Sequence, residues 1–135
     1  MTLLQVHLTA ASAWLGLVAG ETVMELHARG SSAQRLIARI HKWIDLFFEG
    51  PLVVIVLLTG AALLARAWPI SPLLALKVGA ALVAVIANFI CIPLVLARAR
   101  AQTDEALRAL TRKIGATGVA IPFGIAALVI GLFGL

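Results

Sequence analysis

The sequence predicts an integral membrane protein of the all-α class. One domain, residues 1–135, is expected to form a bundle of four transmembrane helices with both termini outside. Composition is the first observation behind this prediction. Hydrophobic residues make up 62% of the chain and charged residues only 13%, whereas soluble domains are about 45–50% apolar and about 25% charged. The second observation is that the apolar residues form four runs, each close to the roughly 20 residues that a membrane-spanning helix needs.

Charged or turn-forming residues flank the four runs and set their limits. We expect spans over residues 3–25, 44–66, 72–96 and 114–134. The amphipathic stretch 32–43 is expected to extend the second helix backwards, and residues 104–113 the fourth. The first run is expected to be a retained helix and not a signal peptide, because no basic residue precedes it. Gly50-Pro51 is expected to interrupt the second helix near its inner end.

The basic residues predict the orientation. They concentrate in the first and third connections and the adjoining helix ends, as Arg29, Arg35, Arg39, Lys42, Arg98, Arg100, Arg108, Arg112 and Lys113. Lys and Arg mark cytoplasmic loops, so these two connections are expected in the cytoplasm and the chain in the inner (plasma) membrane. The net charge of +5 is divided between apolar runs. It therefore indicates topology and no nucleic-acid partner.

Ionisable residues inside the spans are the informative positions, because a buried charge in a membrane is costly and needs a partner. At 100° per residue, the polar side chains of the first helix fall within roughly 40° of one another. They are His7, Trp14, Glu21 and Glu25. The second helix carries His41, Asp45 and Glu49 at a spacing of four. Five candidate metal ligands or proton carriers are thus expected to meet at the cytoplasmic end: Glu21, Glu25, His41, Asp45 and Glu49, with His27 as a candidate sixth.

This inner group has three interpretations. Carboxylates with imidazole suit Zn, Mn or Fe(II), and a spacing of four can place two ligands on one metal. The same residues can instead relay protons. Alternatively, the acids only form salt bridges with nearby basic residues, for which the candidates are Arg29, Arg35, Arg39 and Arg112.

A second pair of ionisable residues, His7 and Lys77, is expected near the outer end. Lys77 either extends to the outer headgroups or faces the bundle as a cation, with Asn88 and Cys91 within about 60° of its face. His7 is either an interfacial residue, or an axial haem ligand, metal ligand or proton carrier.

Several short motifs extend over most of the chain. They are His7 followed by Ala and Trp14, then Leu26-His27, the Arg-rich stretch 34–42, the Gly-containing apolar run 58–64, Leu76-Lys77, and Arg98 with Arg100. In this pattern the chain resembles the small four-helix HemJ-type protoporphyrinogen oxidase family and, more loosely, the copper-resistance D-type membrane domains. The resemblance implies haem as cofactor and a porphyrin-type substrate. It also implies that His7 binds the cofactor and that Lys77 acts in both cofactor binding and catalysis.

Three functions therefore remain open. The first is a haem-associated membrane oxidoreductase resembling HemJ-type protoporphyrinogen oxidase. The second is a small cation or proton transporter or channel subunit that uses the inner acidic group. It draws support from Gly50-Pro51, since irregular backbone in a membrane tends to line a cavity, and it requires a homo-oligomer because four helices make a narrow bundle. The third is an accessory membrane subunit without a site of its own.

Overall fold

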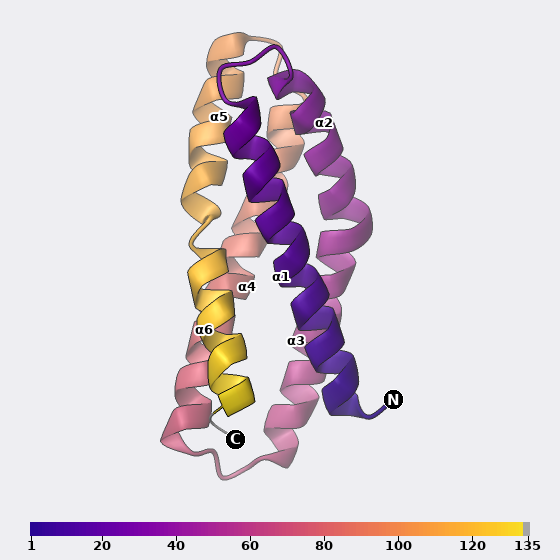
Figure 1. The fold of residues 1–135 in the computed structure, drawn as a ribbon, viewed down its shortest axis with the longest axis vertical. Helices are drawn as coiled ribbons and strands as arrows, with labels where there is room; N and C mark the ends of the chain where they lie inside the picture. The colour runs from indigo at the N-terminus through magenta and orange to yellow at the C-terminus, as the bar shows by residue number, and fades with distance from the viewer. Residues whose placement is uncertain (134–135) are drawn as a thin grey trace.

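The computed structural model describes residues 1–133, and their regular structure is all helical. The helices form four rods that lie side by side (Figure 1). In chain order the elements are α1 Leu3–Ala28, α2 Gln34–Ile44, the π-helical turn η1 Asp45–Glu49, α3 Gly50–Arg66, α4 Pro72–Ala99, α5 Asp104–Thr117 and α6 Ala120–Phe133. Because α2, η1 and α3 follow one another without a gap, they make one rod. The helices α5 and α6, separated by residues 118–119, make another.

Four helical segments are long and apolar enough to cross a membrane: Leu3–Ala28, Gln34–Arg66, Pro72–Ala99 and Asp104–Phe133. The predicted backward extensions of the second and fourth helices are present. The second begins at Gln34 and not at residue 32, and the fourth is interrupted between α5 and α6 at residues 118–119. The first and third helices each end three residues later than predicted. The predicted end of the fourth helix, residue 134, lies outside the described residues.

Side-chain caps explain where three of the rods begin. The Thr2 hydroxyl accepts a hydrogen bond from the backbone N–H of Gln5, and the Gln5 side chain accepts one from the Thr2 N–H. Ser71 and Thr103 accept corresponding bonds at the starts of α4 and α5. Pro72 occupies the first position of α4, where its missing N–H is not needed. These caps satisfy donors that a helix start leaves unpaired.

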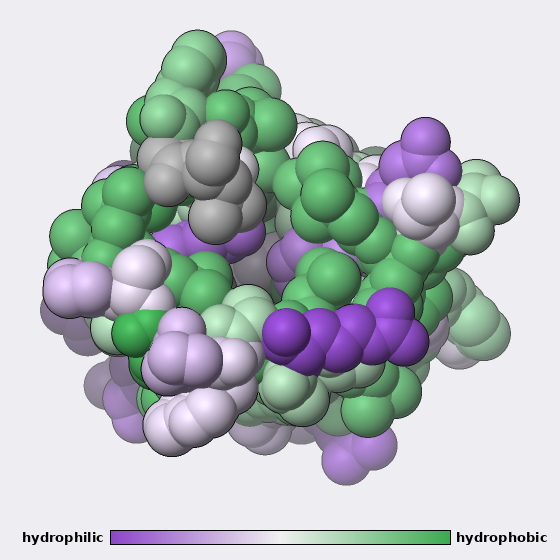
Figure 2. Space-filling view, turned by 90° about the horizontal axis from the view of Figure 1, so that it is seen from below, coloured by the Kyte–Doolittle hydropathy of each residue, from purple (hydrophilic) through white to green (hydrophobic). Residues whose placement is uncertain are grey.

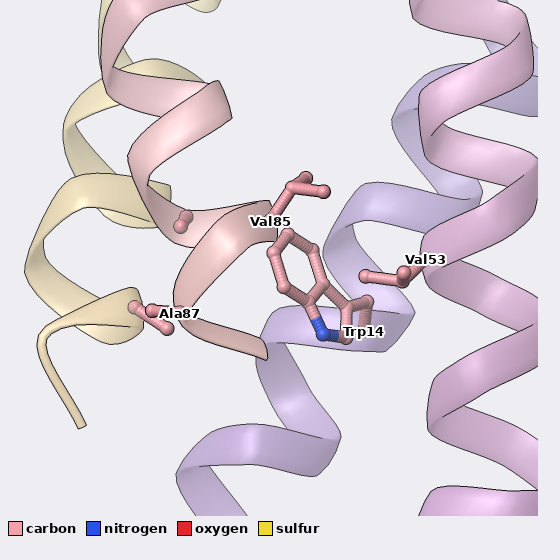
Figure 3. Close-up of a cluster of buried hydrophobic side chains, with 6 residues drawn as sticks. Trp14, Val53, Val85 and Ala87 are labelled. Atoms are coloured by element: carbon pink, nitrogen blue, oxygen red, sulfur yellow. The ribbon is translucent and has the colours of Figure 1, made fainter. Parts of the chain in front are cut away.

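The connections divide the bundle into two ends (Figure 1). Residues 29–33 and 100–103 join helices at one end, here called the basic end because most Arg and Lys residues lie there. Residues 67–71 join α3 to α4 at the opposite end, beside the start of α1 and the end of α6. Between the two ends, the Trp14 indole packs among Val53 of α3, Val85 of α4 and small alanines (Figure 3). Small residues let helices approach closely in a membrane.

The second rod contains a widened turn before Pro51. Proline lacks an N–H, and its ring clashes with the carbonyl four residues earlier in an α-helix. Here the N–H of Gly50 bonds to the carbonyl of Asp45, five residues back. This single turn therefore holds one residue more than a turn of α-helix. The predicted interruption at Gly50-Pro51 is therefore a π-helical turn inside a continuous rod. Such turns occur frequently at functional sites.

Candidate functional site

The structure brings together the five residues predicted to meet near the basic end. This acidic cluster consists of Glu21, Glu25, His41, Asp45 and Glu49. Its side chains come from α1, α2 and η1, and four of the five are buried. Asp45, at 1% exposure, is among the most deeply buried side chains of the described residues.

His41 lies at the centre of the acidic cluster. Its Nδ1 is 2.8 Å from an oxygen of Glu25. Its Nε2 is 3.4 Å from Oδ1 of Asp45 and 3.6 Å from Oε2 of Glu21. One imidazole therefore contacts three carboxylates through its two nitrogens.

Glu49 is fixed by donors from the other helices. The indole Nε1–H of Trp14 donates to Oε1 of Glu49 at 3.4 Å, and the amide of Asn88 donates to the same oxygen. Both donors are buried. The carboxylate of Glu49 is thus anchored from α1 and from α4, which orients it toward the cluster.

Arg98 supplies a guanidinium to the cluster. Its Nη1 donates to Oε2 of Glu25 at 2.8 Å, and its Nη2 donates to Oε1, which is the bidentate geometry that arginine favours with carboxylates. Its side chain is 0% exposed. Among residues 1–133, no other arginine or lysine forms an ion pair with the acidic cluster.

The salt-bridge partners proposed from sequence are not the ones that the structure shows. Of the four arginines expected to pair with the acids, Arg35 pairs with Asp104 at the surface, 2.6 Å apart. Within the described chain, no ion pair joins Arg29, Arg39 or Arg112 to the cluster. All three of these arginines are exposed at the basic end, where their long side chains reach solvent more easily than the bundle interior.

The charges of the acidic cluster do not balance. Four carboxylates face one guanidinium and one imidazole. Glu21 Oε1 and both carboxylate oxygens of Asp45 are buried and have no hydrogen-bond partner among residues 1–133. Oxygen atoms of Glu21, Asp45 and Glu49 lie within 4.8 Å of one another. An unpaired buried charge is strongly unfavourable, so this arrangement requires protons or a cation.

A cavity of about 110 Å³ lies against the cluster. Glu21, Glu25 and Glu49 line one part of it, and Cys91 of α4 and Gly118 line another. Gly118 lies in the short interruption between α5 and α6. The cavity has room for an ion or several waters, since about 10–15 Å³ of such volume is enough to hold one water molecule.

His27, the sixth candidate, does not join the cluster. Its side chain is exposed, and its Nδ1 lies 2.8 Å from the carbonyl oxygen of Val23 in the same helix. Asn88 lies about three turns along α4 from Lys77, close to the same face, and its amide donates to Glu49. The five residues predicted from helical spacing to lie together do so. Asn88 and Arg98 of α4 also contact the cluster, and the sequence did not predict these contacts.

The second candidate site lies toward the opposite end. His7 and Lys77 line the same apolar cavity of about 410 Å³ between α1, α3 and α4, and Figure 2 shows a hollow between the helices in the view from this end. The Thr59 hydroxyl donates to the carbonyl of Ile55 at 2.6 Å, so its oxygen accepts from Nδ1–H of His7 at 2.8 Å. This assignment leaves Nε2 of His7 with a free lone pair.

Two glycines make room for these side chains. A Cβ on Gly60 would lie 3.2 Å from Cε1 of His7, and a Cβ on Gly131 would lie 2.7 Å from Nζ of Lys77. Lys77 is half-buried and passes close to α6. Its ammonium group therefore lies inside the bundle near Gly131, as the bundle-facing interpretation expects.

No protein-family model matches the chain, and comparisons with curated proteins and with solved structures give no significant match.

Proposed function

We propose that this chain is a membrane protein that binds and moves cations, protons included, through the acidic cluster, as a small transporter or channel subunit. The supporting observation is the set of buried oxygens of Glu21, Asp45 and Glu49, which lie within 4.8 Å of one another. Among them, both oxygens of Asp45 lack a hydrogen-bond donor. Ionisable residues that face the interior of a membrane bundle mark ion pathways and proton relays.

The proposed topology follows from the charges at the two ends. The basic end lies in the cytoplasm and both termini lie outside, because Lys and Arg accumulate in cytoplasmic loops. The bilayer is the inner (plasma) membrane. The cluster then opens toward the cytoplasmic half of the membrane. Because four helices leave only a narrow interior, the working unit is a homo-oligomer.

Reconstitution into lipid vesicles tests this proposal. Vesicles carry either a metal-sensitive dye, with Zn²⁺ or Mn²⁺ added outside, or a pH-sensitive dye under an imposed membrane potential. We expect faster metal or proton entry than in protein-free vesicles, and loss of that entry in Asp45→Asn. Asp104→Asn is the matched control, because Asp104 is 73% exposed at the surface. Folded protein that neither binds nor moves any of these cations would contradict the proposal.

A haem-associated redox function is a second candidate, favoured by the cavity that contains His7 and Lys77. His7 would hold the haem iron through its free Nε2, and the hydrogen bond at the other nitrogen would fix the orientation of the ring. Lys77, which lines the same cavity, would pair with a propionate or with a carboxylate of a porphyrin-type substrate. The residues present thus fit one ligand to the iron and one carboxylate partner. Haem bound there would supply the oxidoreductase chemistry.

The absorption spectrum of the purified protein tests this second function. Protein incubated with haem is compared with His7→Ala and with His27→Ala, whose histidine is exposed at the other end. We expect a Soret band that His7→Ala loses and His27→Ala keeps. Protein that takes up no haem would remove this function and leave the cation proposal untouched.

A further inference from the structure

We propose that the ion of the acidic cluster is a borderline transition metal of the Zn²⁺ class, bound by His41, Asp45 and Cys91. This inference rests on the proposed function and adds the identity of the ion. One potential ligand atom from each of these three residues lies within 4.8 Å of the other two. The three side chains come from α2, η1 and α4, so the site exists only in the folded bundle.

The types of ligand select the class of metal. Mg²⁺ and Ca²⁺ are bound by oxygen atoms, whereas an imidazole nitrogen together with a sulfur suits Zn²⁺ and its neighbours. Cys91 is the single cysteine of the chain, and it binds metal as a thiolate. The thiol therefore separates this set from the oxygen-only set of Glu21, Asp45 and Glu49.

The hydrogen bond to Glu25 prepares His41 as a ligand. Nδ1 of His41 lies 2.8 Å from Oε1 of Glu25 and 3.0 Å from Nη2 of Arg98. Because Nη2 already donates to Oε1 of Glu25 and the carboxylate can only accept, we assign the proton of a neutral imidazole to Nδ1. Nε2 then presents a lone pair toward Asp45, 3.4 Å away. Metal-binding histidines commonly donate their other N–H to a carboxylate in this way. Arg98 in turn holds Glu25 through both of its oxygens.

Among residues 1–133, no arginine or lysine forms an ion pair with Asp45. Nε2 of His41 and the two oxygens of Asp45 all carry lone pairs, and neither Asp45 oxygen receives a hydrogen bond. Asp45 is 1% exposed, so bulk water does not compensate its charge. A divalent cation between the three ligands would remove this repulsion.

The geometry also suits an ion that must leave again. Zn²⁺ bonds of about 2.0–2.3 Å place ligand atoms under about 4 Å apart, so small side-chain rotations have to close the trio. Structural zinc sites have four protein ligands, whereas three protein ligands leave an open position. Cys91 and His41 both line the 110 Å³ cavity, which gives a fourth ligand or an incoming ion access to the site.

Cobalt substitution tests this assignment in the purified full chain in detergent. Protein stripped with a chelator is titrated with Co²⁺, and the absorption is recorded before and after Zn²⁺ is added. We expect a thiolate-to-cobalt charge-transfer band that Zn²⁺ abolishes. Because the chain has one cysteine, this band can arise only from Cys91.

Two variants separate the roles of the residues. Cys91→Ser is expected to lose the charge-transfer band and to bind Zn²⁺ at least about tenfold more weakly, while Mn²⁺ binding changes little. Glu25→Gln is expected to keep the band and to weaken Zn²⁺ binding by about 10–100-fold, as for a residue that orients a ligand. Circular dichroism and gel filtration confirm that each variant is folded.

The outcomes distinguish this inference from the function beneath it. Divalent cations that bind without a charge-transfer band, or with equal affinity in Cys91→Ser, would overturn the zinc assignment and leave cation binding in place. Proton movement without any divalent binding would do the same. Absence of both metal binding and proton movement in folded protein would overturn the inference and the proposed function together.

Discussion

The two candidate sites use histidine in opposite surroundings. His41 contacts three carboxylates in a buried cluster whose charges do not balance. His7 is held by one neutral hydroxyl and lies in an apolar cavity. A site with surplus buried charge demands an ionic partner, whereas a histidine in an apolar cavity suits an uncharged or amphipathic one. The same residue type therefore points to different ligands at the two ends of one bundle.

Among the variants that test this comparison, removal of the Arg98 guanidinium from the acidic cluster is expected to change the free energy of unfolding most. Arg98→Ala should lower the free energy of unfolding by about 3–5 kcal/mol, because it leaves the Glu25 carboxylate, only 13% exposed, without its cation. The measurement is unfolding in detergent followed by circular dichroism. Arg35→Ala is the matched control, since its pair with Asp104 is exposed and is worth at most about 1 kcal/mol. Equal effects for the two variants would show that the buried pair is not structurally important.

Asp45→Asn is expected to have the opposite sign. Neutralising a buried carboxylate that lacks hydrogen-bond donors should raise the free energy of unfolding by on the order of 2 kcal/mol in metal-free protein. The same variant should lose any rise in melting temperature that added Zn²⁺ gives the parent protein. Thermal melts with and without Zn²⁺ measure both effects. A variant that is less stable without metal would indicate that Asp45 is already compensated, by a proton or otherwise.

Thr59→Val alters the other site and should have a smaller effect. It removes the hydroxyl that accepts from His7 and keeps the shape of the side chain. The lost hydrogen bond should lower the free energy of unfolding by about 1 kcal/mol. Haem uptake should weaken as well, because the ring loses its fixed orientation. Unfolding and haem titration of the variant check the two parts, and unchanged haem uptake would argue against His7 as the ligand.

Gly60→Ala is expected to have the smallest effect on stability. Its new Cβ would lie 3.2 Å from Cε1 of His7, so the imidazole must shift by a few tenths of an ångström. Alanine favours helix over glycine by about 0.5–1 kcal/mol, which offsets much of the crowding. The expected result is a nearly unchanged melting temperature with an altered His7 environment, measured by NMR of the histidine ring. A large drop in melting temperature would show that the cavity wall is rigid.

Helical spacing was sufficient to predict the rods and the members of the acidic cluster. Glu21 and Glu25 share a face of α1, and His41 and Asp45 share a face of α2 with η1. Spacing within one helix says nothing about which residue of another helix it meets. Arg98 was therefore counted as a topology signal, although it lies buried at the end of α4. Its distance of 73 residues from Glu25 along the chain can be bridged only by tertiary packing.

The extra residue of η1 also fixes the rotational phase between the two sites. An α-helix turns by about 100° per residue, and the five residues of η1 cover about the rotation of four α-helical residues. If Asp45–Glu49 continued as an ordinary α-helix, α3 would be rotated by about that angle relative to α2. Such a rod would keep its apolar composition and would still be long enough to span a membrane, but Thr59 would turn away from His7. One widened turn therefore aligns a histidine on α2 and a threonine on α3 with their separate partners on α1.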